Sequence, residues 1–154
     1  MIEIREARPE DLDAIVSLLG ELKDVTLSSA PIAPAAVRKT YQRMLRFPEV
    51  YRNCVAVENS RVVGLISMVL YKTLLHAGGT ALINELVVSE SARRRGIGRK
   101  LVEAAIAVAR VRGMEEIEVG TETGNHVARR FYKSMGFGQE YLLFGREFER
   151  PRSF

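Results

Sequence analysis

The stretch from Leu86 to Val102 constrains the fold more than any other part of the chain, because it joins three elements in a fixed order. An apolar strand ends at Val88, a loop rich in arginine and glycine follows, and an apolar helix begins at Gly98. The first amides of such a helix have no intrahelical partner and, with the helix dipole behind them, bind phosphate groups. The stretch therefore predicts a strand–loop–helix unit that meets an anion.

Two common phosphate-binding motifs do not describe this loop. A Walker loop needs a lysine followed by serine or threonine, but Lys100 is followed by Leu101. A dinucleotide-binding loop needs a third glycine, and Leu101 stands in its place. A solvated run of charges that caps a core helix is the alternative, and the loop alone leaves both interpretations open.

The formal net charge of +4 comes from one region of the sequence. Between Ser91 and Gly113 there are seven basic residues against the single acid Glu103, whereas the rest of the chain has 16 basic and 18 acidic residues. Few aromatic residues flank the arginines, so the pattern does not favour stacking of nucleic-acid bases. A nucleic-acid-binding domain is an alternative, but we expect no specific nucleic-acid partner.

Length and composition indicate one domain over residues 1–154, with 47% apolar and 27% charged residues. No apolar run reaches the roughly 18 residues of a membrane span, and the first residues do not resemble a signal peptide. We therefore expect a cytoplasmic protein without a membrane partner. Cys54 has no second cysteine to pair with, and His76 and His126 lie far apart in the sequence, so no metal site is expected.

Hydrophobic periodicity and turn residues predict the element order βααβββαβαββ. Hairpins combined with helical crossovers indicate an α/β fold of the α+β type, in which four helices flank a mixed, mostly antiparallel sheet of about seven strands. The predicted strands are residues 2–6, 54–58, 61–71, 81–88, 116–121, 137–140 and 142–148. The first predicted helix begins at Pro9, and the other three span residues 34–47, 98–112 and 126–135. Residues 150–154 are predicted to form a loose tail.

A second pattern follows the strand that ends at Thr121. Asn125 precedes a helix, where its side chain either caps the helix or bonds a ligand amide. Ala128 and Tyr132 are four residues apart and share a helix face, so a ligand that approaches over the small alanine meets the tyrosine phenol. The alternative is that Asn125 is only a cap and Tyr132 an ordinary core aromatic.

Taken together, the two segments resemble the GCN5-related N-acetyltransferase (GNAT) superfamily. Its acetyl-CoA loop, Arg/Gln-x-x-Gly-x-Gly/Ala, is matched at residues 93–98, although Glu90 replaces the proline of the preceding segment. Its later motif, Asn-x-x-Ala-x-x-x-Tyr-x-x-x-Gly-Phe, is matched at all five positions from Asn125 to Phe137. The element order of the whole chain also agrees with this family.

The resemblance implies an enzyme that transfers the acetyl group of acetyl-CoA directly to a primary amine, with no metal. A non-catalytic acyl-CoA sensor on the same fold is the alternative. In the family pattern, the Val88 amide polarises the thioester carbonyl and Tyr132 protonates the departing thiolate. The residues implied to bind acetyl-CoA are Leu86, Val87, Val88, Arg93, Arg94, Arg95, Gly96, Ile97, Gly98, Arg99, Asn125, Ala128 and Tyr132.

The general base is not fixed by the motifs. Some family members carry a carboxylate five residues before the motif asparagine, but Gly120 occupies that position here. Glu85 and Glu122 are the catalytic candidates, acting on the amine through a water, and a surface carboxylate is the alternative for each. His76 and His126 are interpreted as exposed histidines.

The acceptor is a small molecule, a lysine side chain or a protein N-terminus. Family resemblance assigns acceptor contacts to the loops at residues 28–34 and 72–79, which contain no acids, so they do not favour a polycationic amine. The apolar residues 142–144 are predicted either to form a homodimer seam or to complete the core.

Overall fold

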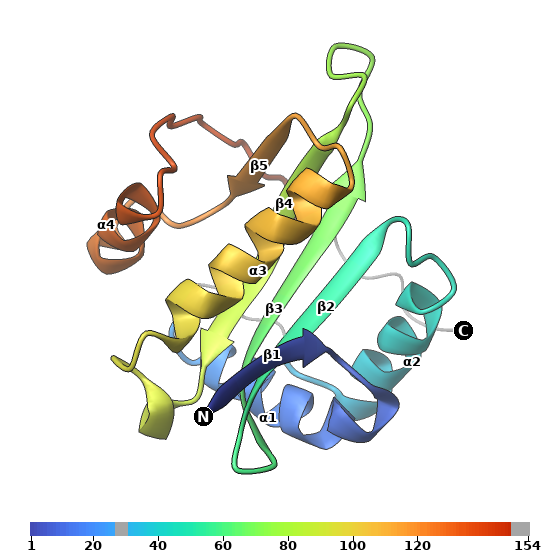
Figure 1. The fold of residues 1–154 in the computed structure, drawn as a ribbon, viewed down its shortest axis with the longest axis vertical. Helices are drawn as coiled ribbons and strands as arrows, with labels where there is room; N and C mark the ends of the chain where they lie inside the picture. Colours follow the sequence, from blue (N-terminus) through green and yellow to red (C-terminus); the bar gives the residue numbers. More distant parts are fainter. Residues whose placement is uncertain (27–30, 149–154) are drawn as a thin grey trace. The chain divides into compact units, whose positions relative to one another are not determined.

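The computed structural model describes residues 1–26 and 31–148. They fall into two compact units, Met1–Val119 and the described part of Gly120–Phe154 (Figure 1). The predicted tail at 150–154, and residues 28–30 of the predicted loop, lie outside the described residues.

The described part of the first unit is built on a five-stranded sheet whose spatial order, β1-β2-β3-β4-β5, follows the sequence. Strands β1 to β4 pair antiparallel with their neighbours, and β5 joins β4 in parallel. Parallel pairing needs a crossover, which α3 (Ile97–Val111) provides. The strands are β1 (Ile2–Glu6), β2 (Tyr51–Glu58), β3 (Arg61–Tyr71), β4 (Thr80–Val88) and β5 (Glu116–Val119).

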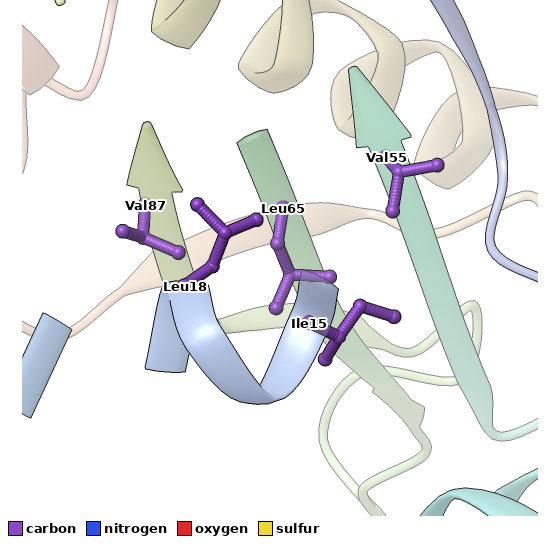
Figure 2. Close-up of a cluster of buried hydrophobic side chains, with 5 residues drawn as sticks. All are labelled: Ile15, Leu18, Val55, Leu65 and Val87. Atoms are coloured by element: carbon purple, nitrogen blue, oxygen red, sulfur yellow. The ribbon is translucent and has the colours of Figure 1, made fainter. Parts of the chain in front are cut away.

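Helices α1 (Leu12–Lys23) and α3 cover opposite faces of this sheet. Leu65 of β3 belongs to the buried cluster that α1 contributes to, whereas a Cβ on the preceding Gly64 would lie 3.0 Å from Leu101 of α3. Successive strand residues point to opposite faces, so the two helices enclose β3 and β4 between them. The α1 cluster consists of Ile15, Leu18, Val55, Leu65 and Val87 (Figure 2).

Prolines mark the beginnings of the first two helical segments, where a missing amide costs no hydrogen bond. Pro9 opens the short turn η1 (Pro9–Asp11), which leads into α1, and Pro34 opens α2 (Pro34–Met44). The predicted second helix is therefore correct at its start but three residues too long at its end, because residues 45–47 form a turn instead.

An irregularity interrupts β4 near its middle. Ser67 of β3 pairs with Glu85, but the next residue, Met68, pairs with Ile83. Asn84 is therefore an extra residue in β4, a β-bulge, and its side chain is exposed.

The bulge coincides with the end of β5. Strand β5 pairs with the four residues of β4 that precede the bulge, the last pair being Ile83 and Val119. Beyond it, no strand in the described part of the chain pairs with β4 on that side. We call residues 84–88 on this side the open edge of β4.

The second unit contains α4 (His126–Ser134). Asn125 caps the helix, since its side-chain oxygen accepts the amide of Ala128 at 3.0 Å. The helix ends in a turn in which Phe137 donates its amide to the carbonyl of Tyr132 at 3.1 Å. The sequence motif therefore sets both ends of α4.

The predicted fold class is confirmed, and residues 1–26 and 31–148 contain five strands in place of about seven. Strands at residues 137–140 and 142–148 were expected but are wrong, because the structure assigns no strand to these residues. An apolar run forms a strand only if a neighbouring strand accepts its backbone hydrogen bonds. Here Leu142, Leu143 and Phe144 are 80%, 93% and 91% exposed.

A buried ion pair joins β1 to the start of α1. Arg5 donates to both carboxylate oxygens of Asp11, at 2.7 and 2.9 Å, and the Arg8 amide adds a third bond at 2.7 Å. Asp11 is only 6% exposed. The hydrogen bonds from Arg5, followed by that from Arg8, hold the pKa of the Asp11 carboxyl below its usual value.

We expect Asp11→Asn to lower the free energy of unfolding at pH 7 by about 1.5–3 kcal/mol. The folded-state pKa of Asp11 lies below the unfolded value of about 3.9, so its contribution is complete above that pH and disappears as the pH falls below it. Urea unfolding from pH 7 to pH 2 should show a shallower acid dependence in the variant. The control Asp13→Asn removes an exposed carboxylate two residues further along the chain, and an equal loss there would contradict the role of the buried pair.

Candidate active site

The backbone of β4 beyond the bulge alternates between its neighbour β3 and the open edge. Ser89 donates its amide to the Val63 carbonyl at 2.9 Å, so its backbone groups face β3, as do those of Val87. Backbone groups in an antiparallel pair alternate in direction, which turns those of Leu86 and Val88 towards the open edge. An extended ligand can pair with such an edge as another strand would.

The loop after β4 turns through two left-handed residues. Arg94 has φ 58° and Gly96 has φ 77°, and glycine occupies this region without the steric cost that a side chain brings. The first intrahelical bond of α3 joins the Lys100 amide to the Gly96 carbonyl at 3.1 Å. Ile97, which is 1% exposed, fixes the start of α3 in the core. The amides at the beginning of α3 therefore follow directly from the open edge.

Two of the loop arginines have defined partners. Arg93 donates Nε to the Val88 carbonyl at 3.0 Å. Arg95 forms a two-pronged ion pair with Glu58 at the end of β2, at 2.9 and 2.5 Å. This pairing lowers the pKa of Glu58 and raises that of Arg95. Arg94 is exposed, so its charge faces solvent. Arg93 and Arg95 instead bind acceptors on β4 and β2.

Glu85 lies beside the open edge on the side that α1 covers. Leu65 and Val87 face α1, and Ser67 and Glu85 stand two residues from them along the same strands, so they share that face. Ser67 is 6% exposed and Glu85 is half-buried. The other predicted base, Glu122, belongs to the second unit and is exposed.

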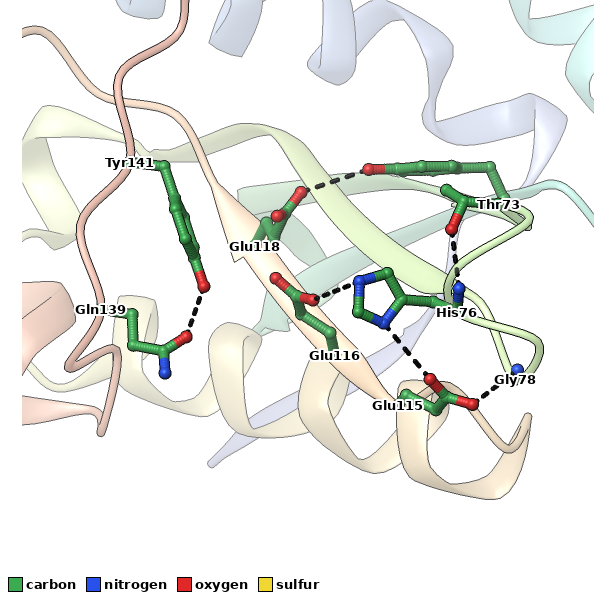
Figure 3. Close-up of polar contacts among 9 residues, drawn as sticks. Thr73, His76, Gly78, Glu115, Glu116, Glu118, Gln139 and Tyr141 are labelled. Carbon is green, nitrogen blue, oxygen red and sulfur yellow. Dashed lines mark hydrogen bonds and ion pairs between the residues drawn. The ribbon is translucent and has the colours of Figure 1, made fainter.

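Acidic side chains hold the loop that follows β3 (Figure 3). His76 Nδ1 lies 3.3 Å from a carboxylate oxygen of Glu115, and Nε2 lies 3.9 Å from Glu116. Glu115 also accepts the Gly78 amide at 2.8 Å. The loop at residues 72–79 contains no acids itself, so its acidic surroundings come from residues almost forty positions later in the chain.

A third carboxylate completes this group. Tyr71 donates its hydroxyl to Glu118 at 3.2 Å, and burial followed by the Glu118 charge raises the pKa of Tyr71. A hydrogen bond to Glu118 is the main cause of the raised pKa of Glu116. We call Glu115, Glu116 and Glu118 the β5 acids. The sequence analysis missed them because only the parallel pairing of β4 and β5 brings them to this loop.

In the second unit, α4 presents the other predicted site residues. Asn125 uses its side-chain oxygen as a helix cap, and Ala128 and Tyr132 lie one turn apart. The Tyr132 ring makes edge contacts with Phe131 and Phe137, with centroids 5.2 and 5.6 Å away. Burial raises the pKa of Tyr132 to about 12, so its phenol stays protonated at neutral pH.

The structure thus brings part of the predicted site together within one unit. Residues 85–88 and the loop at 93–99 are contiguous around the open edge of β4 and the start of α3. Glu122, Asn125, Ala128 and Tyr132 lie in the second unit. The catalytic roles of Glu122 and Tyr132 and the acetyl-CoA-binding roles of Asn125, Ala128 and Tyr132 stay predictions.

Comparison with known proteins agrees with this architecture. A model of the acetyltransferase (GNAT) family matches residues 17–137, and the chain belongs to this family. An aminoalkylphosphonate N-acetyltransferase of Salmonella typhimurium is 34% identical over 142 residues, which cover 92% of this chain and 88% of that protein. N-alpha-acetyltransferase 30 of Schizosaccharomyces pombe is 36% identical over 92 residues, covering 58% and 59%.

The fold has close counterparts among solved structures. Glucosamine-6-phosphate N-acetyltransferase from Arabidopsis thaliana superimposes with a TM-score of 0.81 at 20% identity, covering 97% of this chain and 99% of the other. The resemblance to the GNAT superfamily is therefore confirmed, and the chain is an acetyl-CoA-dependent N-acetyltransferase that transfers an acetyl group to an amine. None of these comparisons favours the non-catalytic sensor.

No group of three or more His, Cys, Asp or Glu side chains is placed to hold a metal ion within residues 1–26 and 31–148. No helix in those ranges has the length and apolar character needed to cross a bilayer.

Proposed function

We propose that the open edge of β4 holds the pantetheine arm of acetyl-CoA and that the loop and first turn of α3 hold its pyrophosphate. The observation that carries this proposal is that β5 stops pairing at Ile83 while β4 continues to Val88. Leu86 and Val88 direct backbone donors and acceptors into the gap, which suits the amides of pantetheine. Residues 93–99 then supply cations and helix amides to the diphosphate.

The proposed chemistry is direct transfer. The neutral amine attacks the thioester carbonyl, its nitrogen forms a bond to carbon, and the carbonyl oxygen becomes an oxyanion. Val88 donates its amide to that oxygen, and Asn125 bonds the pantetheine arm. Collapse of the tetrahedral intermediate breaks the carbon–sulfur bond, and Tyr132 protonates the departing thiolate. The attacking nitrogen gives up one proton as the amide forms, and this proton, passed through water, restores the Tyr132 phenol.

We expect Tyr132→Phe to lower kcat about a hundredfold while the Kd for acetyl-CoA changes less than threefold, because the phenol supplies a proton and little binding energy. Thiol release and calorimetry would measure the two quantities. Tyr141→Phe is the matched control, since that tyrosine lies in the same unit and is 69% exposed. A Tyr132→Phe enzyme with full kcat would remove the phenol from the mechanism.

Glu85 is the proposed base, acting through a water on the incoming ammonium group. Its support is position: it follows the bulge, adjoins Leu86 and faces the side of the sheet that α1 covers. Ser67, opposite it, is a buried hydroxyl that could hold the same water. Glu122 is the competing candidate.

We expect Glu85→Gln to reduce kcat/KM for the amine at pH 7 by about a hundredfold. The loss should shrink as the pH approaches the pKa of the amine, because a deprotonated amine needs no base. Rate measurements from pH 6.5 to pH 10 test this, and Glu122→Gln is run in parallel. The same pH-dependent loss in Glu122→Gln alone would assign the base to Glu122.

The acceptor is proposed to be the primary amine of a small molecule that carries a second positive charge. Glu115 and Glu116 contact His76 and Gly78 of the loop at residues 72–79, to which family resemblance assigns acceptor contacts, and Glu118 bonds Tyr71 just before it. This reverses the expectation drawn from the loops alone. A phosphonate, the group named for the Salmonella relative, would meet Glu116 and Glu118 unfavourably here.

Acetyl-CoA calorimetry followed by thiol release over an amine panel tests the proposal. The panel contains a diamine, an aminoalkylphosphonate of equal chain length, a lysine peptide and a peptide with a free N-terminus. We expect the diamine to have at least a tenfold higher kcat/KM than the phosphonate, and Glu118→Gln to reduce this ratio. A higher kcat/KM for the phosphonate would overturn the proposed acceptor, an amine with a second positive charge. Turnover of a peptide alone would indicate a protein acceptor in its place.

Three further predictions remain proposals. They are the cytoplasmic location, the single-domain organisation over residues 1–154, and a homodimer formed through residues 142–144. Exposure of these apolar side chains supports the homodimer. Sedimentation of the wild-type chain beside a Leu143→Lys variant would test it.

A further inference from the structure

Glu21, in the last turns of α1, contacts the loop that follows β4. One carboxylate oxygen accepts the hydroxyl of Ser89 at 3.1 Å, and the other accepts the amide of Glu90 at 2.8 Å. The second oxygen also lies 3.5 Å from Nη2 of Arg93. A single carboxylate thus binds three successive parts of the loop, although 68 residues separate it from Ser89 in the sequence.

These contacts fix the place where β4 becomes the loop. Ser89 is held from the other side by its amide bond to Val63, and Glu90 opens the short turn η2 (Glu90–Ala92). The first amide of such a turn has no partner within it, and the Glu21 carboxylate satisfies it. The strand end is therefore anchored both to β3 and to α1.

Arg93 extends the anchor to the open edge. Its Nε donates to the Val88 carbonyl at 3.0 Å while Nη2 faces Glu21. A guanidinium between two acceptors has a defined orientation, because its donors form a planar fork. The direction of the Val88 carbonyl and the position of the loop cation are thereby linked to one side chain of α1.

We propose that Glu21 is a positioning residue for acetyl-CoA binding. It holds Ser89, Glu90 and Arg93 in the arrangement that presents the open edge and the loop amides together, and it touches no reacting atom. This inference rests on the proposed placement of acetyl-CoA along β4 and α3.

The test is calorimetry of acetyl-CoA with the wild-type chain, Glu21→Gln and Glu103→Gln. Glu103 is exposed on α3 and is the one acid in the basic stretch, so its variant makes the same charge change without touching the anchor. We expect Glu21→Gln to raise the Kd and the KM for acetyl-CoA roughly tenfold, with the KM for the amine and the melting temperature nearly unchanged. Glu103→Gln should bind as tightly as wild type or slightly more tightly.

A double-mutant cycle separates positioning from general destabilisation. If Glu21 acts through Arg93, then Glu21→Gln should cost much less in an Arg93→Ala background than in wild type. Ser89→Ala, which removes one contact of the anchor, should give a smaller rise in Kd and serves if Glu21→Gln does not fold.

The outcomes distinguish the two proposals. An unchanged or lower Kd in a folded Glu21→Gln, with wild type binding acetyl-CoA, would overturn the positioning role and leave the binding site intact. A wild-type chain that binds no acetyl-CoA would instead overturn the proposed binding site. A tenfold effect that is fully additive with Arg93→Ala would also contradict the link through Arg93.

Discussion

The mismatch in length between β4 and β5 is the constraint on which the candidate site depends. A strand edge inside a folded protein needs hydrogen-bond partners, and β5 supplies them only as far as Ile83. The bulge at Asn84 changes the register at the same point, so among the described strands the last part of β4 pairs with β3 alone. The backbone groups on this edge, apart from the Val88 carbonyl that Arg93 bonds, are the ones that the proposed extended ligand would pair with.

The charges around this edge are arranged in pairs, which explains why a loop with so many arginines is stable beside a buried strand. Glu58 neutralises Arg95, and Glu21 faces Arg93, whereas Arg94 is directed to solvent. Arg93 and Arg95 are thus already balanced by Glu21 and Glu58. Bound phosphate groups would add their negative charge to this balanced arrangement. Removing one of these acids therefore affects geometry as well as charge, and control variants must match the charge change.

Local sequence features were sufficient to predict the five strands and the helices found in the described residues, because a strand, a glycine turn and a helix cap each depend on neighbours in the chain. The β5 acids and Glu21 could not be assigned in this way, since their partners lie tens of residues distant. The two C-terminal strands were predicted wrongly for the same reason, because strand formation depends on partners that lie elsewhere in the chain. The apolar run at residues 141–144 is compatible with a strand, but pairing depends on a partner that the run itself does not contain.

The proposed acid, Tyr132, has the protonation state that its role requires. Tyr132, with a pKa near 12, retains its proton at every working pH, so it can donate but cannot serve as a base at neutral pH. A free thiol has a pKa of about 8.5, and transfer from such a phenol to a solvated thiolate would be uphill. Burial raises the pKa of any group whose charged form is an anion, and a thiolate formed in the same poorly solvated place experiences this effect as well. In the proposed mechanism, the desolvation that raises the pKa of Tyr132 would also raise the pKa of the leaving thiol, so the two pKa values would differ less than those of the free groups.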